Sequence, residues 1–212
     1  MLLVKDSMAR DVVTLAPGST AGEALALCRE RRIRHLPVVE EGRLVGIVSD
    51  RDLRSATPAL GDPDRAKALG EIRVGDVMAK DVVTAAPDDP IDWAANTMRE
   101  RGINCLPVLE RDELVGIVTS SDVMGSLVYL LGAHEPGSRM EVVVPDRPGT
   151  LAGVAGLIGE LGINIVSVVS GPQQEGSPPT RVAVFRVDTI DPSHAAEVLG
   201  RADYMVLWPP EA

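Results

Sequence analysis

The stretch RHLPVVEEGRLVGIVSDRD, residues 34–52, is repeated 70 residues later as NCLPVLERDELVGIVTSSD, residues 104–122. The residues before each copy repeat at the same offset, as MARDVVTLAP at 8–17 and MAKDVVTAAP at 78–87. A common offset over two separate stretches indicates an internal duplication. One copy of about 50 residues cannot bury its apolar face alone, so we expect the two copies to pack as a pseudo-symmetric pair.

Each copy is expected to contain a helix in its first half. In the first copy, Thr20 and Glu23 have the spacing of a capping box, which predicts a helix from Ala21 to about Arg31. In the second copy, Asp89 is the expected N-cap and Pro90 the expected first helical residue.

Extended segments surround that helix. Residues 12–13 predict a short strand, and the β-branched runs 36–40 and 44–48, joined by Glu41-Gly42-Arg43, predict a hairpin. A second capping box, Ser49 with Asp52, then predicts another helix. The predicted order of elements in each unit is therefore β-α-β-β-α, and residues 55–71 are predicted to be a linker.

The last 75 residues or so follow a different pattern, β-α-β-β-α-β, which is typical of a ferredoxin-like domain. Its predicted elements are strands at 140–144, 163–169, 181–187 and 204–208 and helices at 151–161 and 192–200. We therefore expect an α+β protein in three segments: 1–70 with the first copy and its linker, 71–133 with the second copy, and 138–212.

The composition excludes several classes of protein. The net charge of −10 argues against binding along a nucleic-acid backbone, which requires an excess of Lys and Arg. No apolar run is long enough to span a membrane, and the charges in MLLVKDSMARD come too early for a signal peptide. Cys28 and Cys105 have neither zinc-ligand spacing nor a disulfide pattern, so we expect no metal and a reducing cytoplasm.

The repeated motifs carry a family likeness. Each copy resembles a CBS motif through V-x-T-x-x-P, L-P-V and G-I-V-[S/T]-x-x-D, and two in tandem resemble a CBS pair, or Bateman module. The C-terminal segment resembles an ACT domain through VVVPDRPGTLA and the later LGINI. The order CBS-CBS-ACT resembles the acetoin-utilisation (AcuB-type) proteins of bacteria.

The CBS resemblance implies a regulatory ligand and no cofactor. CBS pairs commonly bind AMP, ADP, ATP or S-adenosylmethionine between their motifs. The closing Asp usually contacts the ribose, and the Ser or Thr three residues earlier contacts a phosphate. In this chain these residues are Ser49, Asp52, Thr119 and Asp122. The resemblance also implies a homodimer, for which C₂ symmetry is the default.

The chemistry of these residues fits that role. A helix N-terminus presents free N–H groups and partial positive charge to a phosphate, and an ionised Asp accepts hydrogen bonds from two sugar hydroxyls. The alternative is that Ser49 and Asp52 only cap their helix, which contributes about 1 kcal/mol.

The two copies differ in charge ahead of the hairpin. The first has Arg34 and His35, at the position where basic residues of other CBS pairs often neutralise a phosphate of the ligand. The second has Asn104 and Cys105 there. Arg is suited to phosphate by its planar donor fork. We therefore expect one cleft to be better equipped for a phosphate, although the basic residues alternatively form a solvated helix end. Thr14 and Thr84 are two further candidates for ligand contact. The alternative is that they are ordinary residues at the end of a strand.

In the C-terminal segment, the ACT resemblance implies an amino-acid site at a dimer interface, built from Asp146, Gly149 and Asn164. The alternative is a packing domain whose turn needs Gly for its backbone dihedrals.

No catalytic motif is present, so we expect no enzyme. The expected function is a non-catalytic adenosine-nucleotide sensor with an unknown protein target. The alternatives are a ligand-free scaffold, or the regulatory subunit of an acetoin or central-carbon enzyme.

Overall fold

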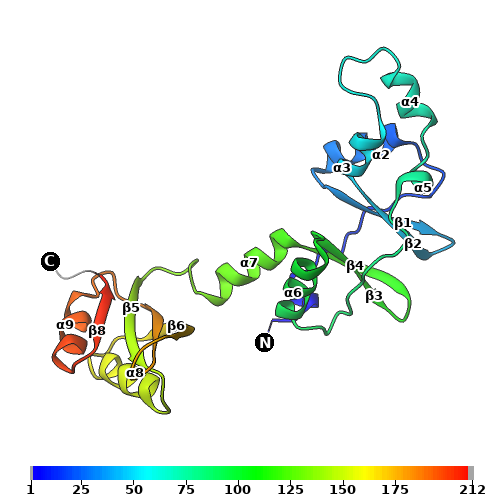
Figure 1. Cartoon of the computed structure of the whole chain (residues 1–212). Helices are drawn as coiled ribbons and strands as arrows, with labels where there is room; N and C mark the ends of the chain where they lie inside the picture. Colours follow the sequence, from blue (N-terminus) through cyan, green and yellow to red (C-terminus); the bar gives the residue numbers. More distant parts are fainter. Residues whose placement is uncertain (1, 210–212) are drawn as a thin grey trace. The chain divides into compact units, whose positions relative to one another are not determined.

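The computed structural model describes residues 2–209. The chain divides into two compact units, Met1–Ser126 and Leu127–Ala212, and each is described by itself (Figure 1). Within the described residues, none of the helices has both the length and the apolar character needed to cross a bilayer.

The first unit contains the two repeats, and each has the predicted helix, hairpin and second helix. Its elements are α1 (Val4–Ser7), α2 (Ala21–Arg31), β1 (His35–Glu40), β2 (Arg43–Ser49), α3 (Asp50–Ala56), α4 (Arg65–Glu71), α5 (Val74–Val77), α6 (Ile91–Arg101), β3 (Cys105–Glu110), β4 (Glu113–Thr119) and α7 (Ser120–Leu130), whose last turn belongs to the second unit. The strands pair antiparallel, β1 with β2 and β3 with β4. The Thr20–Glu23 capping box and the helix 21–31 that it predicts are confirmed.

Two local predictions are wrong. Residues 12–13 form no strand, because this segment makes only one parallel bridge, between Leu15 and Val38. Pro90, not Asp89, is the N-cap of α6, because the Asp89 carboxylate instead accepts the backbone N–H of Ala86 at 2.7 Å. The linker 55–71 contains a short helix, α4, at its end.

The two repeats exchange their leading segments. Ala9 and Ile117 pair through backbone hydrogen bonds of 2.9 and 3.0 Å, so the start of the chain completes the second repeat. Seventy residues later, Ala79 pairs in the same way with Ile47 at 2.9 Å and completes the first repeat. This reciprocal arrangement makes the duplicated units one body, as the repeat predicted.

The side chains of the exchanged segments enter the two cores. The core of the second repeat takes in Val4 and Met8, and the core of the first takes in Val74. Because each core is built from two parts of the chain, neither repeat buries its apolar surface without the other's leading segment.

The second unit has the predicted βαββαβ order. Its elements are β5 (Ser138–Pro145), α8 (Thr150–Glu160), β6 (Ile165–Gln174), β7 (Thr180–Val187), α9 (Ser193–Arg201) and β8 (Met205–Trp208). The strand order is β6-β7-β5-β8, and α8 and α9 cover one face of the sheet around the buried Phe185 (Figure 1). Strand β6 extends beyond the predicted strand 163–169, because it resumes pairing with β7 at Gln173 after a bulge.

Candidate functional site

The helix start after β2 brings Ser49 and Asp52 together. The Asp52 Oδ2 atom accepts the Ser49 backbone N–H at 2.9 Å and the Ser49 hydroxyl at 2.6 Å. The Asp52 backbone N–H donates to Ser49 Oγ at 3.2 Å. This reciprocal capping box uses Oδ2 alone, so Oδ1 lies outside the box at the N-terminus of α3.

The second repeat builds the same helix start. Asp122 Oδ2 accepts the backbone N–H and the hydroxyl of Thr119, both at 2.7 Å, and the Asp122 N–H donates to Thr119 Oγ1 at 3.4 Å. Both repeats therefore present one hydroxyl and one carboxylate at a helix N-terminus.

Neighbouring extended segments bring the other candidates near this point in the first repeat. His35 lies directly opposite Ser49 in the β1–β2 register, and the Arg34 carbonyl accepts the Asp50 N–H at 2.9 Å. Thr14 precedes the residue that bridges to Val38 of β1. In the second repeat the matching residues are Thr84, Cys105 opposite Thr119, and Asn104.

The electrostatics of the two repeats differ, as the sequence predicted. Burial lowers the pKa of His35, and the carboxylates of Asp50 and Asp52 partly oppose that effect. At the matching position, burial raises the pKa of the Cys105 thiol to about 12, so this side chain stays neutral, and a thiol has no cationic form. Of the two matching residues, only His35 can carry a positive charge beside its helix start.

The second helix start is also less accessible. Asp52 is exposed, whereas Asp122 is half-buried. Ser126 Oγ donates to the Asp122 carbonyl at 2.9 Å, and the hydroxyls of Ser126 and Ser7 are 2.7 Å apart. Sequence reasoning missed this contact, although Ser7 and Ser126 match the apolar Val77 and Ala56 at the repeat offset.

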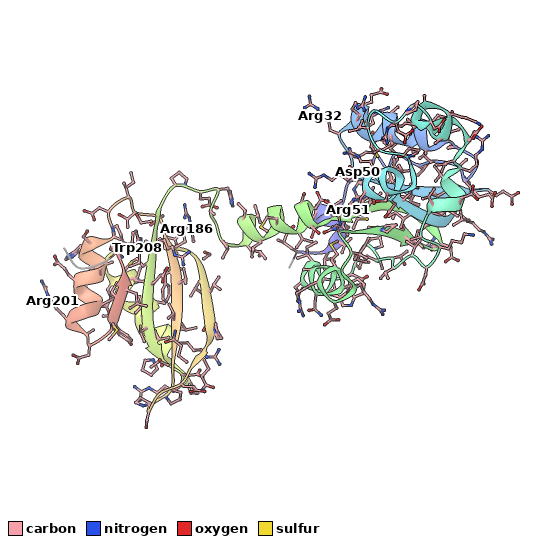
Figure 2. The ribbon with its side chains drawn as sticks, turned by 45° about the horizontal axis from the view of Figure 1, so that its top comes forward. Arg32, Asp50, Arg51, Arg186, Arg201 and Trp208 are labelled. Carbon is pink, nitrogen blue, oxygen red and sulfur yellow. The ribbon has the colours of Figure 1, made fainter. Side chains whose placement is uncertain are left out.

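The remaining basic residues of the first repeat do not gather at Asp52. Arg54 forms an ion pair with Asp50 at 3.2 Å. Arg32 and Arg51 are exposed and point away from the ribbon (Figure 2). Arg34 and His35 adjoin the helix start, Arg34 through its backbone carbonyl and His35 through its register with Ser49.

The expected amino-acid site in the second unit is not assembled within one chain. Asp146 and Gly149 lie in the loop that follows β5, beyond the Pro145–Thr180 pair. Asn164 precedes β6, near Val187, at the opposite end of the sheet. An eight-residue strand separates the two ends by about 24 Å.

The Asp146 carboxylate already has a partner. Its Oδ1 atom accepts the Arg181 Nε–H at 2.8 Å, and this hydrogen bond raises the pKa of Arg181. Gly149 is the N-cap of α8 at φ 87°, so the turn needs glycine for its backbone dihedrals. No local signal predicts the Arg181 contact, because it depends on the pairing of β5 with β7.

Nucleophilic chemistry by the thiols is disfavoured. Both cysteines are buried, and burial raises the pKa of Cys28 to about 11. At neutral pH such thiols hold very little thiolate, the reactive form.

The comparison with known families agrees with this architecture. Residues 4–58 and 74–129 match the CBS domain family, and together they exceed half of the chain. The chain belongs to the CBS domain family. Residues 138–203 match the ACT domain, so a tandem CBS pair is followed by a C-terminal ACT domain.

Individual relatives match through the CBS pair. A structure from Vibrio cholerae that carries the name acetoin utilization protein (AcuB) is 36% identical, with a TM-score of 0.54, and the match covers 64% of this chain and 99% of that one. The CBS domain pair of protein MJ0100, solved with 5′-methylthioadenosine and S-adenosyl-L-methionine, is 31% identical, with a TM-score of 0.52 and the same coverage of 64% and 99%.

A curated relative, homoserine O-acetyltransferase from Methanohalobium evestigatum, is 36% identical over 122 residues. That match spans 57% of this chain but only 23% of the relative. The chain therefore spans about a quarter of the length of that relative.

Proposed function

We propose that this chain is a non-catalytic regulatory protein whose CBS pair binds an adenosine-containing ligand. The observation that carries the proposal is the paired helix starts, Ser49 with Asp52 and Thr119 with Asp122, each with one carboxylate oxygen outside its capping box. An ionised carboxylate suits the two ribose hydroxyls, and the helix N-terminus suits a phosphate.

The likeness to the MJ0100 pair supports the ligand class, since that structure holds two adenosine-containing molecules. Charge at the first repeat favours a ligand with a phosphate, because Arg34 and His35 lie next to Ser49. We therefore propose AMP, ADP or ATP as the regulatory ligand, with no cofactor.

A thermal-shift titration of the full chain with AMP, ADP, ATP, S-adenosylmethionine and adenosine tests this proposal. A ligand present at 100 times its Kd should raise the free energy of unfolding by about 2.7 kcal/mol. We expect at least one adenylate to do so, and GMP serves as the matched control for the base. A flat response to the whole panel would favour a ligand-free scaffold or the regulatory subunit of an enzyme, and capture of a partner protein would then be the next experiment.

The affinity for AMP relative to adenosine should rise as the pH falls from 8 to 6. Burial lowers the pKa of His35 in the free protein, so the ring is neutral at pH 8. A phosphate beside it favours the protonated ring, so binding tightens as the pH falls through the bound-state pKa, by roughly tenfold. Calorimetric titration at both pH values measures this ratio.

His35→Gln is the control for that pH dependence. AMP itself takes up a proton near pH 6, and the variant shows how much of the slope belongs to the ligand. In the variant, we expect the affinity for AMP relative to adenosine to rise less as the pH falls from 8 to 6, or to decrease. An identical slope in both proteins would place the phosphate away from His35 and leave Asp52 as the test of ligand binding.

For the ACT domain we propose a role in pairing two copies. Asp146 and Asn164 lie at opposite ends of the sheet, so an amino-acid site that uses both would need residues from two chains. Such a site would form in a C₂ homodimer, where each loop meets the partner's strand.

A further inference from the structure

A cavity of about 230 Å³ lies between helices α2 and α3 of the first repeat, beneath the linker that leads to α4. Three arginines line it, Arg29, Arg54 and Arg65, together with one carboxylate, Asp50. The rest of the lining is a thiol and aliphatic side chains: Leu25, Cys28, Ile33 and Leu60. Sites for drug-sized molecules measure about 300–1,000 Å³, so this cavity suits a more compact ligand.

Two of the lining arginines, Arg54 and Arg65, make few hydrogen bonds within the protein. Arg65 Nη1 donates to Thr57 Oγ1 at 3.2 Å and to the Pro58 carbonyl, and these bonds fold the linker back over the cavity. Arg54 Nη2 is paired with Asp50 Oδ2 at 3.2 Å. A guanidinium has five N–H donors, so both retain several for a ligand. Three cations against one carboxylate make this lining positive in a chain of net charge −10.

The second repeat is an internal control for the role of these charges. At the repeat offset, Met124 matches Arg54 and Ser120 matches Asp50, whereas Arg29 is retained as Arg99, and the second repeat forms the same helix pair and hairpin. The Asp50–Arg54 ion pair is therefore not required for folding a CBS repeat.

The cavity and the Asp52 carboxylate lie on different faces of α3. Asp50 and Arg54 are four residues apart on α3 and so share one face of the helix. Asp52 is two residues from Asp50, which is about 200° around the helix axis, on the opposite face. A ligand in the cavity would therefore not contact the Asp52 carboxylate.

We infer that the first CBS repeat carries a second binding site, between α2, α3 and the linker, for a small organic anion with a compact aliphatic body. The aliphatic residues Leu25 and Ile33 would contact the body, and the guanidinium groups of Arg29, Arg54 and Arg65 would bind the carboxylate or phosphate head. This site goes beyond the adenylate proposal and does not depend on it.

Methyl NMR of the full chain tests the inference, with isovalerate as the probe and the δ1 methyl of Ile33 as the reporter. Isovalerate should shift this methyl in a saturable way, and inorganic phosphate, which lacks the aliphatic body, should bind more weakly. Arg54→Met should weaken isovalerate binding by about tenfold or more, since a hydrogen bond to a charged group is lost. Asp50→Asn should tighten it a few-fold, because the one opposing carboxylate is removed.

Arg51→Met is the matched control, since it removes the same charge from the same helix at an exposed position outside the lining (Figure 2). We expect its affinity for isovalerate to stay within about twofold of the parent. Equal losses in the two arginine variants, no saturable shift at Ile33, or a response to phosphate but not isovalerate would each overturn the inference. Because Met124 occupies the matching position of the second repeat, Arg54→Met should fold, and an unchanged adenylate thermal shift in this variant keeps the two proposals distinguishable.

Discussion

Gly116→Ala should lower the free energy of unfolding of the CBS unit by about 2–3 kcal/mol, because this glycine lies under the exchanged N-terminal segment. A Cβ atom at Gly116 would lie 2.4 Å from the Met8 sulfur and 3.2 Å from the Ala9 carbonyl oxygen. Met8 is 8% exposed, so its side chain has little room to move away. Chemical denaturation of the full chain measures the change.

The control is Gly125→Ala in α7, where a Cβ would have nothing within 4 Å. Alanine is the better helix former, so this variant should be stabilised by up to about 1 kcal/mol. Truncating Met8 to alanine tests the cause. If the clash explains the loss, Met8→Ala should cost less in the Gly116→Ala protein than in the parent, with a coupling energy of about 1–3 kcal/mol.

If the stability losses of Gly116→Ala and Met8→Ala simply add in the double variant, the clash explanation is contradicted. Gly46 supplies an independent repetition, because a Cβ there would lie 2.4 Å from the Met78 sulfur in the first repeat. Similar losses at both glycines would show that each repeat depends on the segment that precedes the other.

The sequence predicted the parts of the fold that depend on neighbouring residues or on the internal repeat. The capping box at Thr20 and Glu23 needs only neighbouring residues, and helix 21–31 has the expected bounds. The N-cap of α6 was predicted wrongly because Asp89 can bond backward as well as forward, and the N–H of Ala86 takes its carboxylate. Propensity alone does not decide between two such partners.

The contacts that position the sites lie between distant residues. Arg181 reaches Asp146 only because β7 pairs with β5, and Arg65 reaches Thr57 only because the linker turns back to begin α4. The sequence contains the residues that make these contacts, but it does not show which residue contacts which. The same limit applies to Asp146 and Asn164, which the family likeness places in one site and the strand order separates.

Asp52→Ala should weaken binding of the preferred adenylate by about 150-fold or more. The carboxylate would accept hydrogen bonds from the ribose hydroxyls, and bonds to a charged group contribute about 1.5–3 kcal/mol each. At a ligand concentration of 100 times the parent Kd, stabilisation should therefore fall from about 2.7 to about 1 kcal/mol or less. Asp122→Ala should have the smaller effect, because Asp122 is half-buried and has Cys105 in place of a cation nearby.

Loss of the helix cap is the confounding effect, since Asp52 also closes the box with Ser49 and its removal costs about 1 kcal/mol of stability. Glu23→Ala separates the two roles. Glu23 closes the box with Thr20 at distances of 2.7 and 3.0 Å, close to those at Asp52, but caps α2 rather than α3. We expect Glu23→Ala to lose the same stability and keep the full adenylate shift. If both variants keep that shift, the Asp52 carboxylate is a cap only, and the ribose contact must be sought on the second repeat.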